Sequence, residues 1–167
     1  MRPAFRTFSL FALGLLLAGS LPAQALWPDT RAGMTVEEVQ KLFPDAHEPQ
    51  TPGELPAAHG TELLEIDETV IADHRFRVRF FFNDNSRLVH VDLVETAEIM
   101  MKDFEKFRDL LRAKYGLEYS TTNSVSIRLE WHVIKTIIRL QWTPVTHEIA
   151  TLSISYDAPI PKDTERL

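Results

Sequence analysis

Hydrophobic and polar residues alternate along much of the chain with the two-residue period of β-strands. Residues 75–82 alternate strictly, so one face of that strand carries Phe76, Val78, Phe80 and Phe82, and the other carries Arg75, Arg77, Arg79 and Phe81. The same period predicts strands over residues 63–72, 89–93, 125–133, 136–142 and 149–156. The polar run at 83–86 predicts a hairpin turn, because Asn and Asp tolerate positive φ.

Two segments instead show helical signals. Thr35 is followed three residues later by Glu38, which is the pattern of a capping box, and Pro44 ends the short helix that this box begins. A longer helix is predicted over residues 97–115, where an apolar stripe recurs at helical spacing: Met100, Phe104, Phe107, Leu111 and Tyr115. Residues 44–60, rich in Pro and Gly, are predicted to form a long loop.

These elements predict an α+β fold made of one domain, residues 26–157. Clean alternation is typical of antiparallel strands with one covered face, so we expect a two-layer sandwich: an antiparallel sheet of about six strands with both helices on one face. The order helix, three strands, helix, three strands suggests two tandem units, residues 26–95 and 96–157. Residues 158–167, with Pro159 and Pro161, are expected to form a flexible tail.

The first 25 residues have the pattern of a secretory signal peptide. Arg2 and Arg6 precede an uncharged apolar run at 8–18, and Ala23 and Ala25 suit a signal peptidase. The run is too short for a membrane span, which needs about 20 apolar residues, so we expect none after cleavage. Removal of the segment lowers the net charge from −6 to −8, because it contains two arginines and no acidic residue. We therefore expect an exported protein, in the periplasm of a bacterium or, second, secreted to the medium.

Composition excludes several classes of site. The chain has no cysteine, so disulfides, cysteine-ligated metals and thiol nucleophiles are excluded. Its acidic balance argues against nucleic-acid binding. No nucleophile motif is present, and the pair His90 and Asp92, with His132 further across the sheet, is too weak a pattern for a metal site. We therefore expect neither an enzyme nor a cofactor.

Two stretches of the sequence resemble two known families of exported proteins. The run 30–39 (TRAGMTVEEV) and the run 80–91 (FFFNDNSRLVHV) resemble the SmpA/OmlA (BamE) domain and repeats of the β-lactamase inhibitory protein. The resemblance covers about the first half of the mature chain and implies an exported α+β module that binds other proteins. It transfers no binding residue, because the matching residues are structural in those families. The lipid-bearing cysteine of the former and the disulfides of the latter are missing here.

The polar face of the predicted sheet supplies the candidate binding residues: Arg77, Arg79, Phe81, Arg128, Glu130, His132 and Arg139. One interpretation is cross-strand ion pairing. The other is a recognition surface, with arginines as donors and Phe81 as an exposed anchor. Three functions stay open: a non-enzymatic module for a protein partner in the cell envelope, a carrier or sensor of a small anionic ligand, and an unrecognised hydrolase. The sequence does not decide the oligomeric state.

Overall fold

The computed structural model describes residues 27–55, 60–97, 99–122, 125–145 and 150–158. The predicted signal segment and nearly all of the predicted tail lie outside these residues. Within them, no helix is long and apolar enough to cross a membrane.

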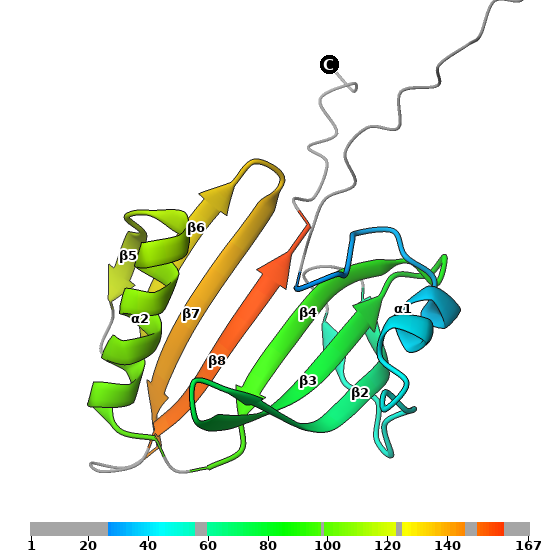
Figure 1. Ribbon diagram of the computed structural model, residues 1–167, viewed down its shortest axis with the longest axis horizontal. Coiled ribbons are helices and arrows are strands. Elements are labelled where there is room, and N and C mark those ends of the chain that lie inside the picture. Colours follow the sequence, from blue (N-terminus) through cyan, green and yellow to red (C-terminus); the bar gives the residue numbers. More distant parts are fainter. Residues whose placement is uncertain (1–26, 56–59, 98, 123–124, 146–149, 159–167) are drawn as a thin grey trace, which may run out of the picture.

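One antiparallel sheet of eight strands forms the body of the protein (Figure 1). In chain order the strands are β1 (Glu54–Leu55), β2 (Gly60–Ile71), β3 (His74–Phe82), β4 (Leu88–Glu95), β5 (Tyr119–Thr122), β6 (Ile127–Val133), β7 (Thr136–Pro144) and β8 (Ala150–Asp157). The spatial order is β1-β2-β3-β4-β8-β7-β6-β5. Helix α1 (Val36–Leu42) precedes the first four strands and α2 (Met101–Tyr115) precedes the last four, and β4 and β8 pair at the centre.

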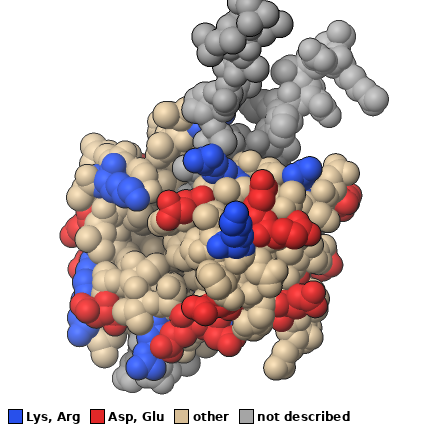
Figure 2. Space-filling view, turned by 45° about the vertical axis from the view of Figure 1, so that its right-hand side comes forward, with Lys and Arg blue, Asp and Glu red and all other residues tan. Residues whose placement is uncertain are grey.

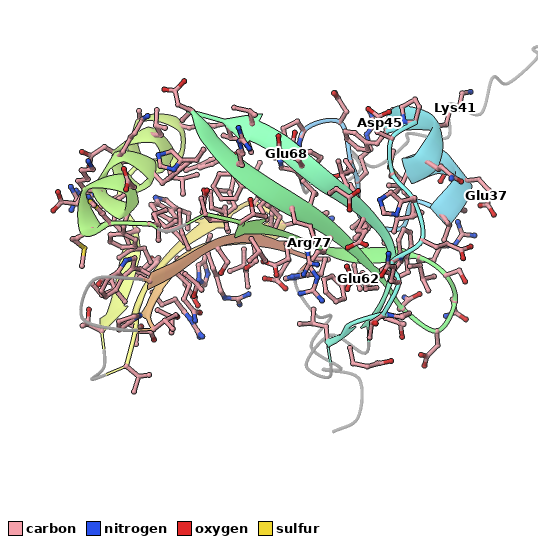
Figure 3. The ribbon with its side chains drawn as sticks, turned by 90° about the horizontal axis from the view of Figure 1, so that it is seen from below. Glu37, Lys41, Asp45, Glu62, Glu68 and Arg77 are labelled. Atoms are coloured by element: carbon pink, nitrogen blue, oxygen red, sulfur yellow. The ribbon has the colours of Figure 1, made fainter. Side chains whose placement is uncertain are left out.

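The predicted sandwich of six strands beneath two helices is wrong. The sheet has eight strands and curls, and its two short helices lie near opposite ends of it rather than covering one face (Figures 1 and 3). The two additional strands are the edges: β1 lies inside the predicted loop 44–60, and β5 lies between the predicted helix 97–115 and the predicted strand 125–133, where no element was predicted. Each helix is therefore followed by four strands, and the predicted unit of a helix with three strands is also wrong.

The first helix begins where the sequence predicted. The Thr35 hydroxyl accepts a hydrogen bond from the Glu38 N–H at 3.2 Å, and the Thr35 N–H donates to Glu38 Oε2 at 2.8 Å. This capping box satisfies two backbone donors at the start of α1. Val39 is the buried residue of α1, so this short helix packs against the rest of the protein through little apolar surface.

The second helix is shorter than predicted. Ala97, Ile99 and Met100 do not belong to the helix: Ile99 makes a β-bridge to Ala150, and the Met100 N–H donates to Asp103 Oδ2 at 3.0 Å. Met100 is exposed and does not belong to the apolar stripe. Of the other predicted positions, Phe104, Phe107 and Leu111 are buried, as helical spacing required, and Tyr115 is partly buried against the core.

The core is a single apolar cluster on one side of the sheet. It receives the predicted inward-facing residues of β3 and β4 together with those of β6, β7 and β8, including Phe76, Phe80, Leu93, Trp131 and Leu140. Trp131 is fully buried, and its indole N–H donates to the Gly116 carbonyl at 2.8 Å, so its polar atom is satisfied at the end of α2. The opposite side of the sheet is left to polar residues.

Candidate functional site

The seven predicted binding residues lie on this polar side of the sheet. Direct cross-strand partners share a face, and the registers Arg79 with Asp92, His90 with Asp157, and Arg139 with Glu130 connect β3 to β6. The structure divides the residues into two groups: Arg77, Arg79 and Phe81 on β3, and Arg128, Glu130, His132 and Arg139 on β6 and β7.

The group on β6 and β7 is joined by ion pairs. Arg139 binds Glu130 through Nε at 2.9 Å and Asp157 through a second nitrogen. His132 Nε2 lies 3.4 Å from Glu130, and Asp157 contacts His90 Nδ1 at 2.7 Å. Burial alone would raise the pKa of Glu130, but the hydrogen bond and charge of Arg139 outweigh burial and lower it. The charge of Arg139 is therefore neutralised within the sheet.

Arg128 differs from the other arginines of that group. It is exposed, and its guanidinium donates to the side-chain oxygen of Gln141 at 3.1 and 3.2 Å, which leaves its charge uncompensated by that contact. His132 is also half-exposed, with its ring 5.3 Å from that of the exposed Tyr119.

Phe81 is buried rather than exposed, so the prediction of an apolar anchor at this position is wrong. Its residue exposure is 2%. The Arg79 guanidinium lies over its ring at 4.9 Å, the His90 ring meets it at 5.2 Å, and the chain at Gly60 passes close to its Cβ. Strand parity placed Phe81 on the polar face correctly, but these neighbours cover it there.

A polar pocket of about 410 Å³ opens beside the β3 group. It is lined by His47, Gln50, Thr51, Glu62, Glu65, Asp67, Arg77 and Arg79. The lining comes from three pieces of chain: the segment that follows α1, strand β2 and strand β3. Glu62 and Arg77 lie on the underside of the strands in Figure 3, whereas Glu68 lies further along β2 toward the hairpin.

Two irregularities in β2 give the pocket its acidic side chains. One extra residue, Leu63, interrupts the pairing with β3, and a second register shift lies between Ile66 and Thr69. Such β-bulges re-aim side chains without breaking a strand. Because of the first bulge, Glu62 and Glu65 both face the pocket although they are three residues apart, and Asp67 follows two residues later.

The segment after α1 is held against β2 at two points. His47 and Glu65 exchange backbone hydrogen bonds of 2.9 and 2.8 Å. At the second point, the Gly53 N–H donates to Glu62 Oε2 at 3.0 Å and the Glu62 N–H donates to the Gly53 carbonyl at 2.9 Å. A Cβ at Gly53 would lie 2.1 Å from Arg79 Nη2 and 2.7 Å from Glu62 Oε2, so any larger residue would force these two side chains to shift.

Glu62 and Arg79 form the buried ion pair of the pocket. Glu62 is 2% exposed, and its Oε2 accepts from the Arg79 guanidinium at 2.7 Å. Its Oε1 is buried and has no hydrogen-bond partner among the described residues. The hydrogen bond between Glu62 and Arg79 is also the main cause that raises the pKa of Arg79. The charge of Asp92, 3.8 Å from Arg79, contributes as well.

His47, Glu65 and Asp67 form a compact cluster in the same pocket. One ligand atom from each lies within 4.8 Å of the other two. His47 Nε2 is 3.2 Å from Asp67 Oδ2, and His47 Nδ1 contacts the Glu48 carbonyl at 3.0 Å. The hydrogen bond to Glu48 and the neighbouring Asp67 raise the pKa of His47.

The pocket is acidic once its internal pairing is counted. Three carboxylates face two guanidinium groups and the imidazole of His47. Arg79 is engaged by Glu62, which leaves Glu65 and Asp67 opposite Arg77 and His47. Arg77 is half-exposed and approaches Glu65 at 3.8 Å, too far for a hydrogen bond. Acidic side chains also gather on the side of the molecule where α1 comes forward (Figure 2).

Sequence reasoning missed this pocket. It identified Arg77 and Arg79, but His47 falls inside the predicted loop 44–60, and the strand predicted over residues 63–72 came without a pairing register. The relevant signal was the set of carboxylates at 62, 65 and 67, because the three-residue step from 62 to 65 breaks the two-residue period and only the bulge aligns them. Comparison of the chain with protein-family models, with curated proteins and with solved structures finds no match, so the resemblance to SmpA/OmlA and β-lactamase-inhibitory proteins stays a prediction.

Proposed function

We propose that this protein is an exported, non-enzymatic binding module of the bacterial periplasm, and that it takes a small, positively charged ligand in the pocket beneath β2 and β3. The observation that carries this proposal is the charge of the pocket: Glu65 and Asp67 face it with Arg77 as their one neighbouring guanidinium in the lining. An anionic ligand would meet these two carboxylates, and a cation would be attracted by them.

Size and position support a small ligand. A volume of about 410 Å³ falls in the range of about 300–1,000 Å³ that is typical of small-molecule sites. Glu65 is 7% exposed, so its interactions with a ligand would be little screened by solvent. The lining is polar, which favours charged groups over an apolar ligand.

A titration followed by amide NMR spectra tests the proposal. We expect methylammonium, lysine or spermidine to shift the amides of His47, Glu62 and Glu65, and phosphate or succinate to leave them in place. Glu65→Gln should weaken binding by about tenfold or more, since it removes one of the two carboxylates that attract the ligand. The matched variant Glu68→Gln makes the same change on β2 outside the pocket and should leave binding unchanged. Binding of the anions at the pocket, or no binding of any cation, would contradict the proposal.

A second candidate function is recognition of a protein partner in the cell envelope through the same polar face. Arg128 favours it, because this exposed guanidinium is paired with a neutral amide and is free to engage a partner's carboxylate. A defined envelope partner that binds this face should lose affinity for Arg128→Glu and keep it for Lys135→Glu, the same change in the β6–β7 turn. Equal loss in both variants would indicate a general effect of net charge.

A further inference from the structure

We propose that His47, Glu65 and Asp67 bind a divalent transition-metal cation of the zinc class. The inference names the ligand of the pocket described above and so rests on the proposed function. Zinc holds imidazole nitrogen and carboxylate oxygen at about 2.0–2.2 Å, which places two tetrahedral ligand atoms about 3.4 Å apart. His47 Nε2 and Asp67 Oδ2 are 3.2 Å apart, and the Glu65 oxygen, which lies within 4.8 Å of both, needs a shift of at most about 1.4 Å.

The imidazole of His47 is already oriented as a ligand. Its Nδ1 contacts the Glu48 carbonyl at 3.0 Å, and a neutral ring that donates this hydrogen bond presents the lone pair of Nε2 to Asp67. Histidine ligands in metal sites are held in this way by their second ring nitrogen. A lone pair and a carboxylate oxygen 3.2 Å apart repel each other unless a cation lies between them, either a proton on Nε2 or a metal ion.

The backbone fixes the two other ligands relative to His47. The reciprocal hydrogen bonds between His47 and Glu65 set these two residues side by side, and Asp67 lies two residues along the same strand. The site therefore needs only side-chain movement to close around an ion.

An independent observation comes from Glu62. This carboxylate lines the pocket and is 98% buried, judged from its exposed fraction of 2%, and its Oε1 lacks a hydrogen-bond partner among the described residues. A buried acceptor without a partner costs free energy unless something satisfies it. The charge of Glu62 is paired with Arg79 through Oε2, so its contribution is the unpartnered acceptor Oε1 in the wall of the same pocket, which a bound cation or the water it holds would satisfy.

The ligand set selects among metals. One imidazole with two carboxylates suits Zn²⁺, and Mn²⁺ or Fe²⁺ less tightly, because affinity rises from Mn²⁺ toward Zn²⁺ at a given site. Mg²⁺ and Ca²⁺ prefer oxygen ligands alone and need more of them. Three protein ligands leave a fourth position for water or a second ligand group in the pocket.

Arg77 provides a distinctive test because it competes with the metal. Its guanidinium lies 3.8 Å from Glu65 Oε2 and is half-exposed, so it can swing away when an ion binds. Even then, the positive charge of Arg77 would still repel the bound cation from the side of the pocket. Arg77→Gln should therefore tighten Zn²⁺ binding by about fivefold, the effect of one charge at this range in a partly solvated site.

Isothermal titration of the chelator-treated chain without an affinity tag tests the proposal, with ZnCl₂, MnCl₂, MgCl₂ and CaCl₂ as separate titrants. We expect one Zn²⁺ per chain, weaker Mn²⁺ binding and no Mg²⁺ or Ca²⁺ binding at equal concentration. His47→Gln and Asp67→Asn, both at exposed positions that should not impair folding, are expected to weaken Zn²⁺ binding by about 100-fold or more. Glu68→Gln and His132→Gln should leave it unchanged.

The results separate the two proposals. Zinc that binds His47→Gln as tightly as the parent, zinc lost in His132→Gln, or no zinc binding at all overturns the metal site. If zinc fails to bind while spermidine or lysine still shifts the pocket amides, the metal site is wrong and the proposed function stands. If neither binds, both proposals are wrong.

Discussion

Loss of the buried ion pair between Glu62 and Arg79 is the perturbation that we expect to weaken the folded protein most. Glu62 is 2% exposed and depends on two donors, the Arg79 guanidinium at 2.7 Å and the Gly53 N–H at 3.0 Å. Arg79→Met retains the aliphatic stem but leaves the carboxylate buried with one backbone donor. Breaking a buried pair from one side costs about 3–5 kcal/mol of the free energy of unfolding, and we expect a value in that range.

The reverse substitution should cost less. In Glu62→Gln the amide oxygen still accepts hydrogen bonds from both donors. The charge of Arg79 remains partly solvated, because its side chain is 22% exposed, and Asp92 still lies 3.8 Å away. We expect a loss of about 1–3 kcal/mol. The double variant Glu62→Gln with Arg79→Met buries no charge, so it should be more stable than Arg79→Met alone, with a coupling energy of about 1–3 kcal/mol.

Urea unfolding of the three variants and the parent, followed by circular dichroism at pH 7, measures these differences. The unfolding midpoints should shift, while the slope of the free energy of unfolding against urea concentration should stay constant, since the substitutions do not change the surface exposed on unfolding. The argument is refuted if Arg79→Met costs less than about 1 kcal/mol, or if the two single losses simply add, because either result means that Glu62 is not a buried charge that needs Arg79.

Three further variants test other features of the fold. Burial raises the pKa of Glu95, so the folded protein binds this proton more tightly than the unfolded chain, and stability is lost as the pH rises above the pKa of the unfolded state. Glu95→Gln should therefore be about 1 kcal/mol more stable than the parent at pH 8 and no more stable at pH 4, as measured by the midpoints of urea unfolding. Gly53→Ala places a methyl group against Arg79 and Glu62 and should cost about 1–3 kcal/mol, with faster hydrogen exchange at the Glu62 amide; unchanged exchange would contradict the close approach. Thr35→Ala removes the cap of α1 and should lower the thermal midpoint through a loss of about 1 kcal/mol, whereas Thr35→Ser should preserve it.

Local patterns predicted the elements with one buried face and missed those without one. The strand β3 and the stripe of α2 at Phe104, Phe107 and Leu111 were found because burial on one side imposes a period on the sequence. All four residues of β5 are exposed, and β1 is two residues long, so neither carries a period. Because both missed strands are edges, the error fell on the size of the sheet rather than on its core.

The β2 bulge explains why the candidate site could be predicted only in part. If β2 alternated strictly and Glu65 faced the polar side, Glu62 would face the core together with Leu64 and Ile66. A carboxylate there would be buried among apolar side chains without a partner. The extra residue Leu63 resolves this conflict by turning Glu62 to the polar side, opposite Phe81, while Glu65 stays opposite Arg79. The second half of the site, His47, arrives through backbone pairing with Glu65 across 18 positions of sequence that show no period. A carboxylate on the wrong parity of an otherwise alternating strand is thus the signal that sequence does contain. Such a carboxylate indicates a bulge and a partner for its charge. Here the charged partner of Glu62 is Arg79, and the Gly53 N–H donates a further hydrogen bond.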